Sequence, residues 1–298
     1  MNRRDFIEVL GAGSLALGGG RLLGLAAPAA LRPDILIAHG AQVAAIVRAA
    51  IDGIGGIRRF VAKGDVVVVK PNIGWDRTPE QAANTHPQVV STLVTLCFEA
   101  GAAKVKVFDR TCNDPRRGYV QSGIEPAAKA AGAEVSHIDD RKFREVSIPG
   151  GVAIKSWPLY AEALDCNKLI NVPVAKHHGL SRVTLGMKNM MGIMGGNRGQ
   201  IHQRIDDALV DLATVVKPVL TVIDATRILT AHGPQGGSLA DVKKLDLIAA
   251  GTDPVAMDAW GATLFGLTGA DLGYVVKGAA RGLGSMDLSR LRIQRVEA

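Results

Sequence analysis

Apolar residues along this chain follow two different periods in alternation. Short apolar or alternating runs occur at 66–69, 104–108, 134–138, 219–223 and 245–250. Elsewhere, apolar residues recur every three or four positions, at 41–54, 87–100, 124–131 and 200–217. The first pattern is typical of strands and the second of amphipathic helices. Their alternation predicts an α/β fold in which a largely parallel sheet is covered by helices.

The middle of the chain concentrates polar side chains. A short apolar run ends at Asn171, and Lys176, His177 and His178 follow in a predicted loop. From Gly179 onward, the spacing of apolar residues predicts a helix. A strand, a basic loop and a helix in this order often form a ligand site in open α/β proteins, because the first N–H groups of the helix have no partner within it.

The two sides of this predicted helix differ. Met187, Met190, Met191 and Met194 gather on one side, and we interpret them as core-filling residues. Thr184 and Lys188 lie along the edge of the other side, and Asn189 follows. A lysine close to a buried face needs a polar partner. Lys188 is therefore a candidate ligand-binding residue.

Polar residues also follow the ends of other predicted strands. Lys70 and Asn72 follow one strand, Asp109 the next, and Asp224 a later one. The carboxyl ends of parallel strands meet at one edge of a sheet, so these side chains are expected to converge with Asn171 and the basic loop. Taken singly, Asn72, Asp109 and Asp224 are equally explained as turn-forming or helix-capping residues.

A change of pattern divides the chain. Residues 142–154 form short extended pieces around Ile148–Gly151, as is typical of a hairpin. We therefore predict two α/β lobes, residues 31–165 and 166–298, with a cleft between them. A segment of a different kind precedes them at 1–30.

Residues 1–30 resemble a twin-arginine signal peptide. Paired arginines stand within Asn2–Ile7, a moderately apolar stretch follows, and Ala27–Ala29 offers small residues for cleavage. We expect the twin-arginine translocase to export the folded chain to the periplasm or another extracytoplasmic compartment. Arg21 and six glycines interrupt the apolar stretch, so we expect no stable membrane span once the signal is removed. A retained signal would tether the chain to the membrane.

Composition restricts the kinds of ligand. The 298 residues carry a formal net charge of +7, which favours a small anionic ligand. Basic residues are scattered and aromatic residues make up only 4%, so we expect no nucleic-acid partner. Cys97, Cys112 and Cys166 are too few and too far apart for an iron–sulfur cluster. A disulfide between Cys112 and Cys166 is allowed in an oxidising compartment.

Histidine and lysine define the chemistry that the chain can support. His177 can act as the base in proton abstraction next to a carboxylate, while Lys176 and Lys188 hold the anion. Alternatively, His177 can bind a divalent metal together with His178 and with His202 or His232, of which we favour His232, although no histidine pair has the spacing that places two imidazoles on one helical face. A serine hydrolase is disfavoured because the Gly-x-Ser-x-Gly turn is missing.

Three segments carry a family resemblance. They are Val66–Asn72 (VVVVKPN), Asn171–His177 followed by Thr184–Gly192 (NVPVAKH and TLGMKNMMG), and Asp246–Asp258 (DLIAAGTDPVAMD). Together they resemble the bacterial and archaeal family called domain of unknown function 362, over most of residues 60–265. Many relatives carry a ferredoxin-like cysteine insert, which this chain lacks. The electron-transfer role implied by those members therefore does not carry over.

The arrangement of Val66–Asp109 is also similar to the nickel-dependent lactate racemase group, in which a strand leads through a polar, proline-containing loop to a helix and a second strand. This likeness ranks isomerase chemistry above hydrolysis. We predict a protein that binds and transforms a small anionic ligand, with or without a divalent metal. The expected ligand-binding residues are Lys70, Asn72, Asp109, Thr184, Asn189 and Asp224. The alternative is a periplasmic accessory protein that holds a metal or an anion without turnover.

Overall fold

A ten-stranded sheet runs through residues 32–298, the part of the chain that this computed structural model describes. Its strands are β1 (Ile35–His39), β2 (Val66–Pro71), β3 (Lys104–Val107), β4 (Glu134–Val135), β7 (Lys168–Val172), β8 (Val174–His178), β9 (Arg182–Thr184), β10 (Leu220–Leu229), β11 (Val242–Gly251) and β12 (Ile293–Glu297). The order across the sheet is β12-β1-β11-β10-β7-β2-β3-β4, with β8 paired to β10 and β9 paired to β8. The predicted signal segment lies outside the described residues.

The α-helices of the described chain connect these strands. They are α1 (Val43–Gly53), α2 (Pro87–Glu99), α3 (Pro115–Gln121), α4 (Ile124–Ala130), α5 (Ala161–Leu164), α6 (Gly186–Asn189), α7 (Ile205–Val215), α8 (Pro254–Thr263) and α9 (Gly273–Ala280). None of the helices in residues 32–298 combines the length and the apolar character needed to cross a membrane.

Most strand pairs of the large sheet are parallel, as predicted. β2 pairs in parallel with β3 and β7, and β10 pairs in parallel with β7 and β8. Antiparallel pairs join β11 to β1 and β10, and β8 to β9. The hairpin expected around residues 142–154 forms a separate two-stranded sheet of β5 (Phe143–Ser147) and β6 (Ser156–Tyr160).

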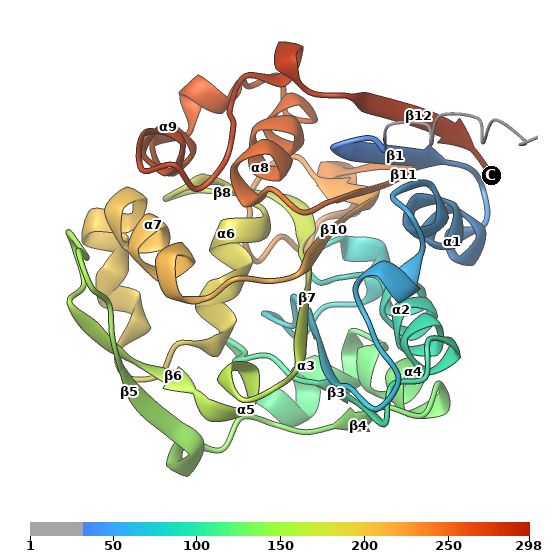
Figure 1. Cartoon of the computed structure of the whole chain (residues 1–298), viewed down its shortest axis with the longest axis horizontal. Helices are drawn as coiled ribbons and strands as arrows, with labels where there is room; N and C mark the ends of the chain where they lie inside the picture. The colour runs from blue at the N-terminus through green and yellow to red at the C-terminus, as the bar shows by residue number, and fades with distance from the viewer. Residues whose placement is uncertain (1–31) are drawn as a thin grey trace, which may run out of the picture. The chain divides into compact units, whose positions relative to one another are not determined.

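Helices cover both faces of the sheet, so each face has its own core (Figure 1). Strand β2 shows the division, because Val67 and Val69 pack with one core and Val68 with the other. The helices α1, α2 and α4 pack on the first face, and α6, α7, α8 and α9 on the second. The run of four valines is therefore buried on both sides, which is the usual state of a central parallel strand.

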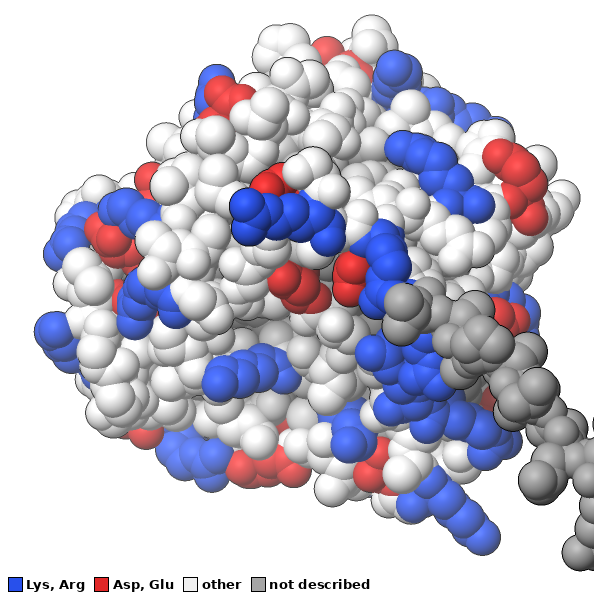
Figure 2. Space-filling model, turned by 45° about the horizontal axis from the view of Figure 1, so that its top comes forward, with Lys and Arg blue, Asp and Glu red and all other residues white. Residues whose placement is uncertain are grey.

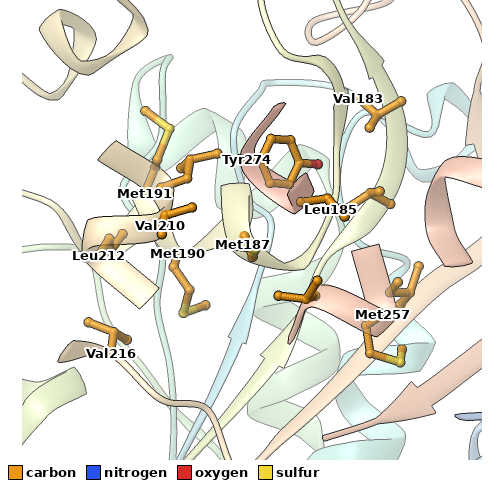
Figure 3. Close-up of a cluster of buried hydrophobic side chains, with 14 of the residues drawn as sticks. Val183, Leu185, Met187, Met190, Met191, Val210, Leu212, Val216, Met257 and Tyr274 are labelled. Atoms are coloured by element: carbon orange, nitrogen blue, oxygen red, sulfur yellow. The ribbon is translucent and has the colours of Figure 1, made fainter. Parts of the chain in front are cut away.

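The methionine-rich segment contributes to the second core. Met187, Met190 and Met191 lie among the apolar side chains of neighbouring elements, including Leu212 and Tyr274 (Figure 3). Met194 belongs to the same core. Their interpretation as core-filling residues is confirmed.

Helix starts follow the expected capping chemistry. The side chain of His86 accepts a hydrogen bond from the Gln88 N–H at the start of α2, and Pro87 occupies the first helical position. Asp253 Oδ1 accepts hydrogen bonds from the N–H groups of Val255 and Ala256, each at 2.9 Å, at the start of α8. Both caps satisfy N–H groups that have no partner within the helix.

The helix predicted from Gly179 is wrong. The predicted loop is strand β8, which turns back as β9, and only the four residues Gly186–Asn189 form α6. Pairing decides the outcome, because β8 bonds to β10 on one side and to β9 on the other. Gly179, interpreted from the sequence as the start of a helix, directly follows β8 in this hairpin, and Arg182 at the start of β9 takes a left-handed backbone with φ of 63°.

The ends of other predicted strands and helices also differ from those in the structure. Strand β10 continues to Leu229, so Asp224 lies inside a strand rather than at its end. The helix predicted from residue 200 begins as an α-helix only at Ile205, after a 3-10 segment at 198–204. Strands β1 and β12 were missed, and both lie at one side of the sheet.

The boundary predicted between residues 165 and 166 falls between α5 and β7. β7 pairs with β2, which precedes the boundary, and with β10, which follows it. The sheet therefore continues across this position, and residues 32–298 form one compact unit.

Charged side chains are distributed over the exterior. On the face shown in Figure 2, Lys and Arg residues form several separate groups, many of them beside Asp or Glu. Exposed ion pairs such as Arg48–Glu99 and Lys277–Asp207 also bring opposite charges together. A single continuous basic stripe is not seen on that face.

Candidate functional site

A buried ion pair lies where β2 and β3 end. Lys70 Nζ is 2.8 Å from Asp109 Oδ1, and both side chains are almost fully buried. Lys70 Nζ also donates to the Pro71 carbonyl at 2.8 Å, while Asp109 Oδ2 accepts the Ile73 N–H at 2.6 Å. Burial lowers the pKa of Lys70, and the Asp109 charge opposes this shift. The ion pair therefore joins two strand ends, as the parallel topology predicted.

A chain of amide groups extends from the ends of β2 and β7 to α6. Asn72 Nδ2 donates to Asn189 Oδ1 at 2.9 Å, and Asn189 Nδ2 donates to Asn171 Oδ1 at 2.9 Å. Asn171 Nδ2 then donates to the Gly186 carbonyl at 2.9 Å. At the other end, Lys176 Nζ donates to Asn72 Oδ1 at 2.9 Å. These bonds hold the strand ends and α6 in a fixed relation.

A cavity of about 330 Å³ opens against this network. Six of the predicted site residues line it, namely Asn72, Asp109, Lys176, Thr184, Lys188 and Asn189. The remaining lining residues are Gly74, Trp75, Arg110, Cys112, His178, Gly179, Leu180, Met191, Gly192, Arg198, His202, Gly233 and Pro234. Lys70 lies directly behind the wall, bonded to Asp109.

Two lysines face this cavity without an acidic partner. Lys176 is 2% exposed and Lys188 is 7% exposed, and within residues 32–298 neither has a carboxylate within 4.0 Å. Burial lowers the pKa of Lys176 to about 7 and that of Lys188 to about 8. Lys176 Nζ donates to Asn72 Oδ1 and to the Ala83 carbonyl, whereas Lys188 Nζ is 3.3 Å from Met191 Sδ and 3.4 Å from His202 Nε2.

Two histidines beside these lysines carry their protons on different ring nitrogens. His178 Nδ1 accepts the Leu180 N–H at 3.1 Å, which leaves the proton on Nε2. His202 Nδ1 is 3.0 Å from the Gly199 carbonyl oxygen, which can only accept, so His202 Nε2 is unprotonated. The rings stack with centroids 5.8 Å apart. Burial and the neighbouring lysines lower the pKa of His178 to about 2, and burial also lowers the pKa of His202.

His177 lies apart from this group. Because side chains alternate along a strand, Lys176 and His178 line the cavity while His177 faces the Gly233–Pro234 turn. His177 Nδ1 accepts the Gly233 N–H at 3.0 Å. The same side chain lines a second cavity with Lys243 and Phe265.

Asp224 and His232 also lie outside the cavity wall. Asp224 Oδ2 accepts the His86 N–H at 2.7 Å, and Oδ1 accepts from the Thr226 hydroxyl at 2.7 Å, so this carboxylate ties a strand to the start of α2. His232 is exposed, with Nδ1 2.9 Å from Asp241 Oδ2. The structure does not bring His177 and His232 into a metal-binding group: within residues 32–298, no three His, Cys, Asp or Glu side chains cluster closely enough to hold a metal ion.

Several cavity residues were not recognised in the sequence. Arg198 donates to the Thr111 carbonyl at 3.0 Å and contacts Cys112 Sγ at 3.5 Å. Arg110 donates to the Met194 carbonyl at 2.8 Å. Arg198 lies among Gly195, Gly196 and Gly199, and His202 was considered only as a metal ligand; no local pattern showed that both residues fold back over the strand ends. Cys112 and Cys166 are free thiols, so the disulfide that the sequence allows is not formed.

Comparison with known proteins gives a family and relatives in sequence and structure. The family described as Domain of unknown function (DUF362) matches residues 67–263, which is more than half of the chain. Among curated proteins, Thylakoid-associated protein sll1697 of Synechocystis sp. is 28% identical over 223 residues, covering 72% of this chain and 67% of the relative.

Two solved structures show a similar arrangement. The lactate racemase apoprotein from Thermoanaerobacterium thermosaccharolyticum matches with a TM-score of 0.49 and 12% identity, over 78% of this chain and 57% of that one. A protein from Thermotoga maritima matches with a TM-score of 0.43 and 8% identity, over 75% and 59%. This chain thus spans less than two thirds of either solved chain. The family match over more than half of the chain leads to one conclusion, which the sequence motifs predicted: the chain belongs to the family Domain of unknown function (DUF362).

Proposed function

We propose that this DUF362 member binds a small organic anion in the cavity beside Lys176 and Lys188 and transforms it by proton transfer. One observation carries the proposal: two buried lysines face one cavity, and no carboxylate of residues 32–298 lies within 4.0 Å of either. A buried ammonium group is costly unless it is paired. A ligand carboxylate would supply the missing negative charge.

The charge around the cavity supports an anion over a cation. Arg110, Arg198, Lys176 and Lys188 contribute positive groups to the lining. The lining carboxylate is Asp109, and its charge is already paired with Lys70. The guanidinium of an arginine presents a planar set of donors that matches a carboxylate. The cavity volume of about 330 Å³ falls within the range of roughly 300–1,000 Å³ that is typical of small-molecule sites.

The two histidines support proton transfer. His202 Nε2 offers a lone pair and His178 Nε2 offers a proton, and both residues line the same cavity as the lysines. An unprotonated imidazole nitrogen and a neighbouring N–H donor are the groups that general acid–base catalysis requires. We assign the proton acceptor to His202 rather than His177, because the Nδ1 of His177 is occupied by the Gly233 N–H.

Calorimetric titration with malonate tests the anion site. Replacing Lys176 by methionine removes a charge but keeps an unbranched side chain, and a hydrogen bond to a charged group contributes about 1.5–3 kcal/mol. We therefore expect Lys176→Met to weaken malonate binding by roughly 10- to 150-fold. Lys63→Met is the matched control, because Lys63 is exposed and does not line the cavity.

The outcome separates a specific site from general attraction to a basic protein. Equal affinities of Lys176→Met, Lys63→Met and the unmodified chain would refute the proposal, as would the absence of malonate binding to the unmodified chain. Circular dichroism of each variant checks that the fold is retained.

A further inference from the structure

The amine of Lys188 differs from the other buried amines at this site. Lys70 is paired with Asp109, and Lys176 donates to two oxygen acceptors. The polar neighbours of Lys188 Nζ in the described chain are instead a thioether at 3.3 Å and an imidazole nitrogen at 3.4 Å. Neither neighbour carries a negative charge that would hold the amine in its protonated form.

We propose that Lys188 is a nucleophile that forms an imine with the carbonyl carbon of a small 2-oxo acid. This inference rests on the proposed function, because the anion site would hold the carboxylate of the oxo acid. A 2-oxo acid fits the arrangement because its carbonyl carbon is bonded directly to the carboxylate, and Arg198 lies close enough to Lys188 to lower its pKa. The cavity is small enough to keep both groups of such a ligand near these side chains.

The protonation state of Lys188 supports nucleophilic attack. Only the unprotonated amine has the lone pair that attacks a carbonyl. With a pKa of about 8, roughly a tenth of Lys188 is unprotonated at pH 7, compared with less than one part in a thousand for an ordinary lysine. Burial is the main cause of this shift, so it does not depend on a particular neighbour.

The step is balanced with the groups present. The Lys188 lone pair bonds to the carbonyl carbon, and the electrons of the C=O π bond move to oxygen. His202 Nε2, which already faces Lys188 Nζ, accepts each amine proton in turn and passes it to that oxygen. The oxygen leaves as water while the C=N bond forms. The products are a neutral imine and one water molecule, and no oxidant or reductant is consumed.

His178 can assist this step. It lines the cavity, and we assign its Nε2–H the role of donating to the carbonyl oxygen while charge develops there. The resulting C=N bond draws electrons from the neighbouring carbon, which makes a C–H on that carbon more acidic. Imine formation would therefore prepare the ligand for the proton transfer proposed above.

Reductive trapping of the full chain tests the imine. The protein is incubated with pyruvate and sodium cyanoborohydride, digested and mapped by mass spectrometry. We expect one saturable adduct on Lys188, with a mass increase equal to one pyruvic acid less one oxygen atom. Malonate should compete with it, lactate should give no adduct, and Lys63→Met should label like the unmodified chain.

The possible failures distinguish the two proposals. If malonate binds but pyruvate gives no adduct, or labels Lys176 or exposed lysines instead, then the imine is refuted while the anion site stands. If malonate does not bind at all, the anion site itself is refuted. Lys188→Arg should lose the adduct, and if that variant fails to fold, the peptide map of the unmodified chain still decides the question.

Discussion

Gly192 lies against the buried Lys70–Asp109 ion pair, and its replacement by alanine should break the pair. A Cβ atom built on Gly192 would be 1.7 Å from Asp109 Oδ1 and 2.6 Å from Lys70 Nζ. Neither atom can move freely, because Lys70 Nζ is bonded to the Pro71 carbonyl and the other Asp109 oxygen accepts the Ile73 N–H. The methyl group must therefore separate the two charges or displace the backbone around Gly192.

The expected loss of stability in Gly192→Ala follows from the burial of both charges. Breaking a buried ion pair by removing one partner costs about 3–5 kcal/mol, because a charge is left without compensation in the interior. Gly192→Ala separates the partners without removing them, and it adds the strain of overpacking, so we expect a loss of about the same size. For a chain of this length, that loss corresponds to a decrease in Tm of about 6–20 °C.

Urea unfolding followed by circular dichroism measures this loss, with Gly199→Ala as the matched control. The Cβ of that alanine would meet only Asn197 Oδ1, at 3.4 Å, so its effect should stay within about 0.5 kcal/mol. In an Asp109→Ala background the clashing oxygen is absent, and Gly192→Ala should cost at least about 1 kcal/mol less than in the unmodified chain. A free energy of unfolding for Gly192→Ala within 1 kcal/mol of the control would show that the ion pair tolerates separation, and the reasoning would be refuted.

Two further predictions concern pH and a loop. Malonate affinity should be highest below pH 7 and should fall as the pH rises through 7 and 8, because Lys176 and Lys188 lose their charge at about these values. Calorimetry at pH 6 and pH 9 measures the change. Equal affinities at the two pH values would count against these lysines as anion-binding residues. Asp211 is fully buried and accepts the N–H groups of residues 152–154 at 2.7–3.0 Å, while also pairing with Arg281. Asp211→Ala should lower the free energy of unfolding, measured in urea, by about 3–5 kcal/mol. It should also speed proteolytic cleavage between β5 and β6. Cleavage at the rate of the unmodified chain would show that other contacts hold this loop.

The sequence predicts the fold best in the parallel sheet, where the position of one strand determines where the neighbouring strand ends. The alternating pattern of valine-rich strands and amphipathic helices predicts a parallel sheet, and a parallel sheet forces strand ends to one edge. The contact of Lys70 with Asp109 follows from that rule, and the contact of Asn72 with Asn189 depends in addition on where residues 171–189 lie. Asp224 followed the alternative explanation, since its carboxylate binds backbone and hydroxyl groups.

The rest of the site depends on contacts between distant residues. Apolar spacing after Gly179 fitted a helix, yet β8 forms because β10 offers it a pairing edge, and only then do Lys176 and His178 share one side without His177. Arg198 and His202 reach the cavity from the 3-10 segment at 198–204, of which residues 200–204 were predicted as part of an α-helix. Tertiary pairing overrides local spacing in both cases, and a single sequence does not display such pairing.

The amide chain from Lys176 to Gly186 has a direction. An ammonium group can only donate and a carbonyl oxygen can only accept, so the two ends together fix which way every amide between them must face. Turning over a single asparagine would set donor against donor on one side and acceptor against acceptor on the other. Aspartate has nearly the same shape but cannot pass a hydrogen onward, so each of these three positions accepts asparagine and rejects its closest isostere. The hydrogen bonds at this edge of the sheet therefore all run in one direction, and replacing any one of the three asparagines by aspartate removes a donor on which the next acceptor depends.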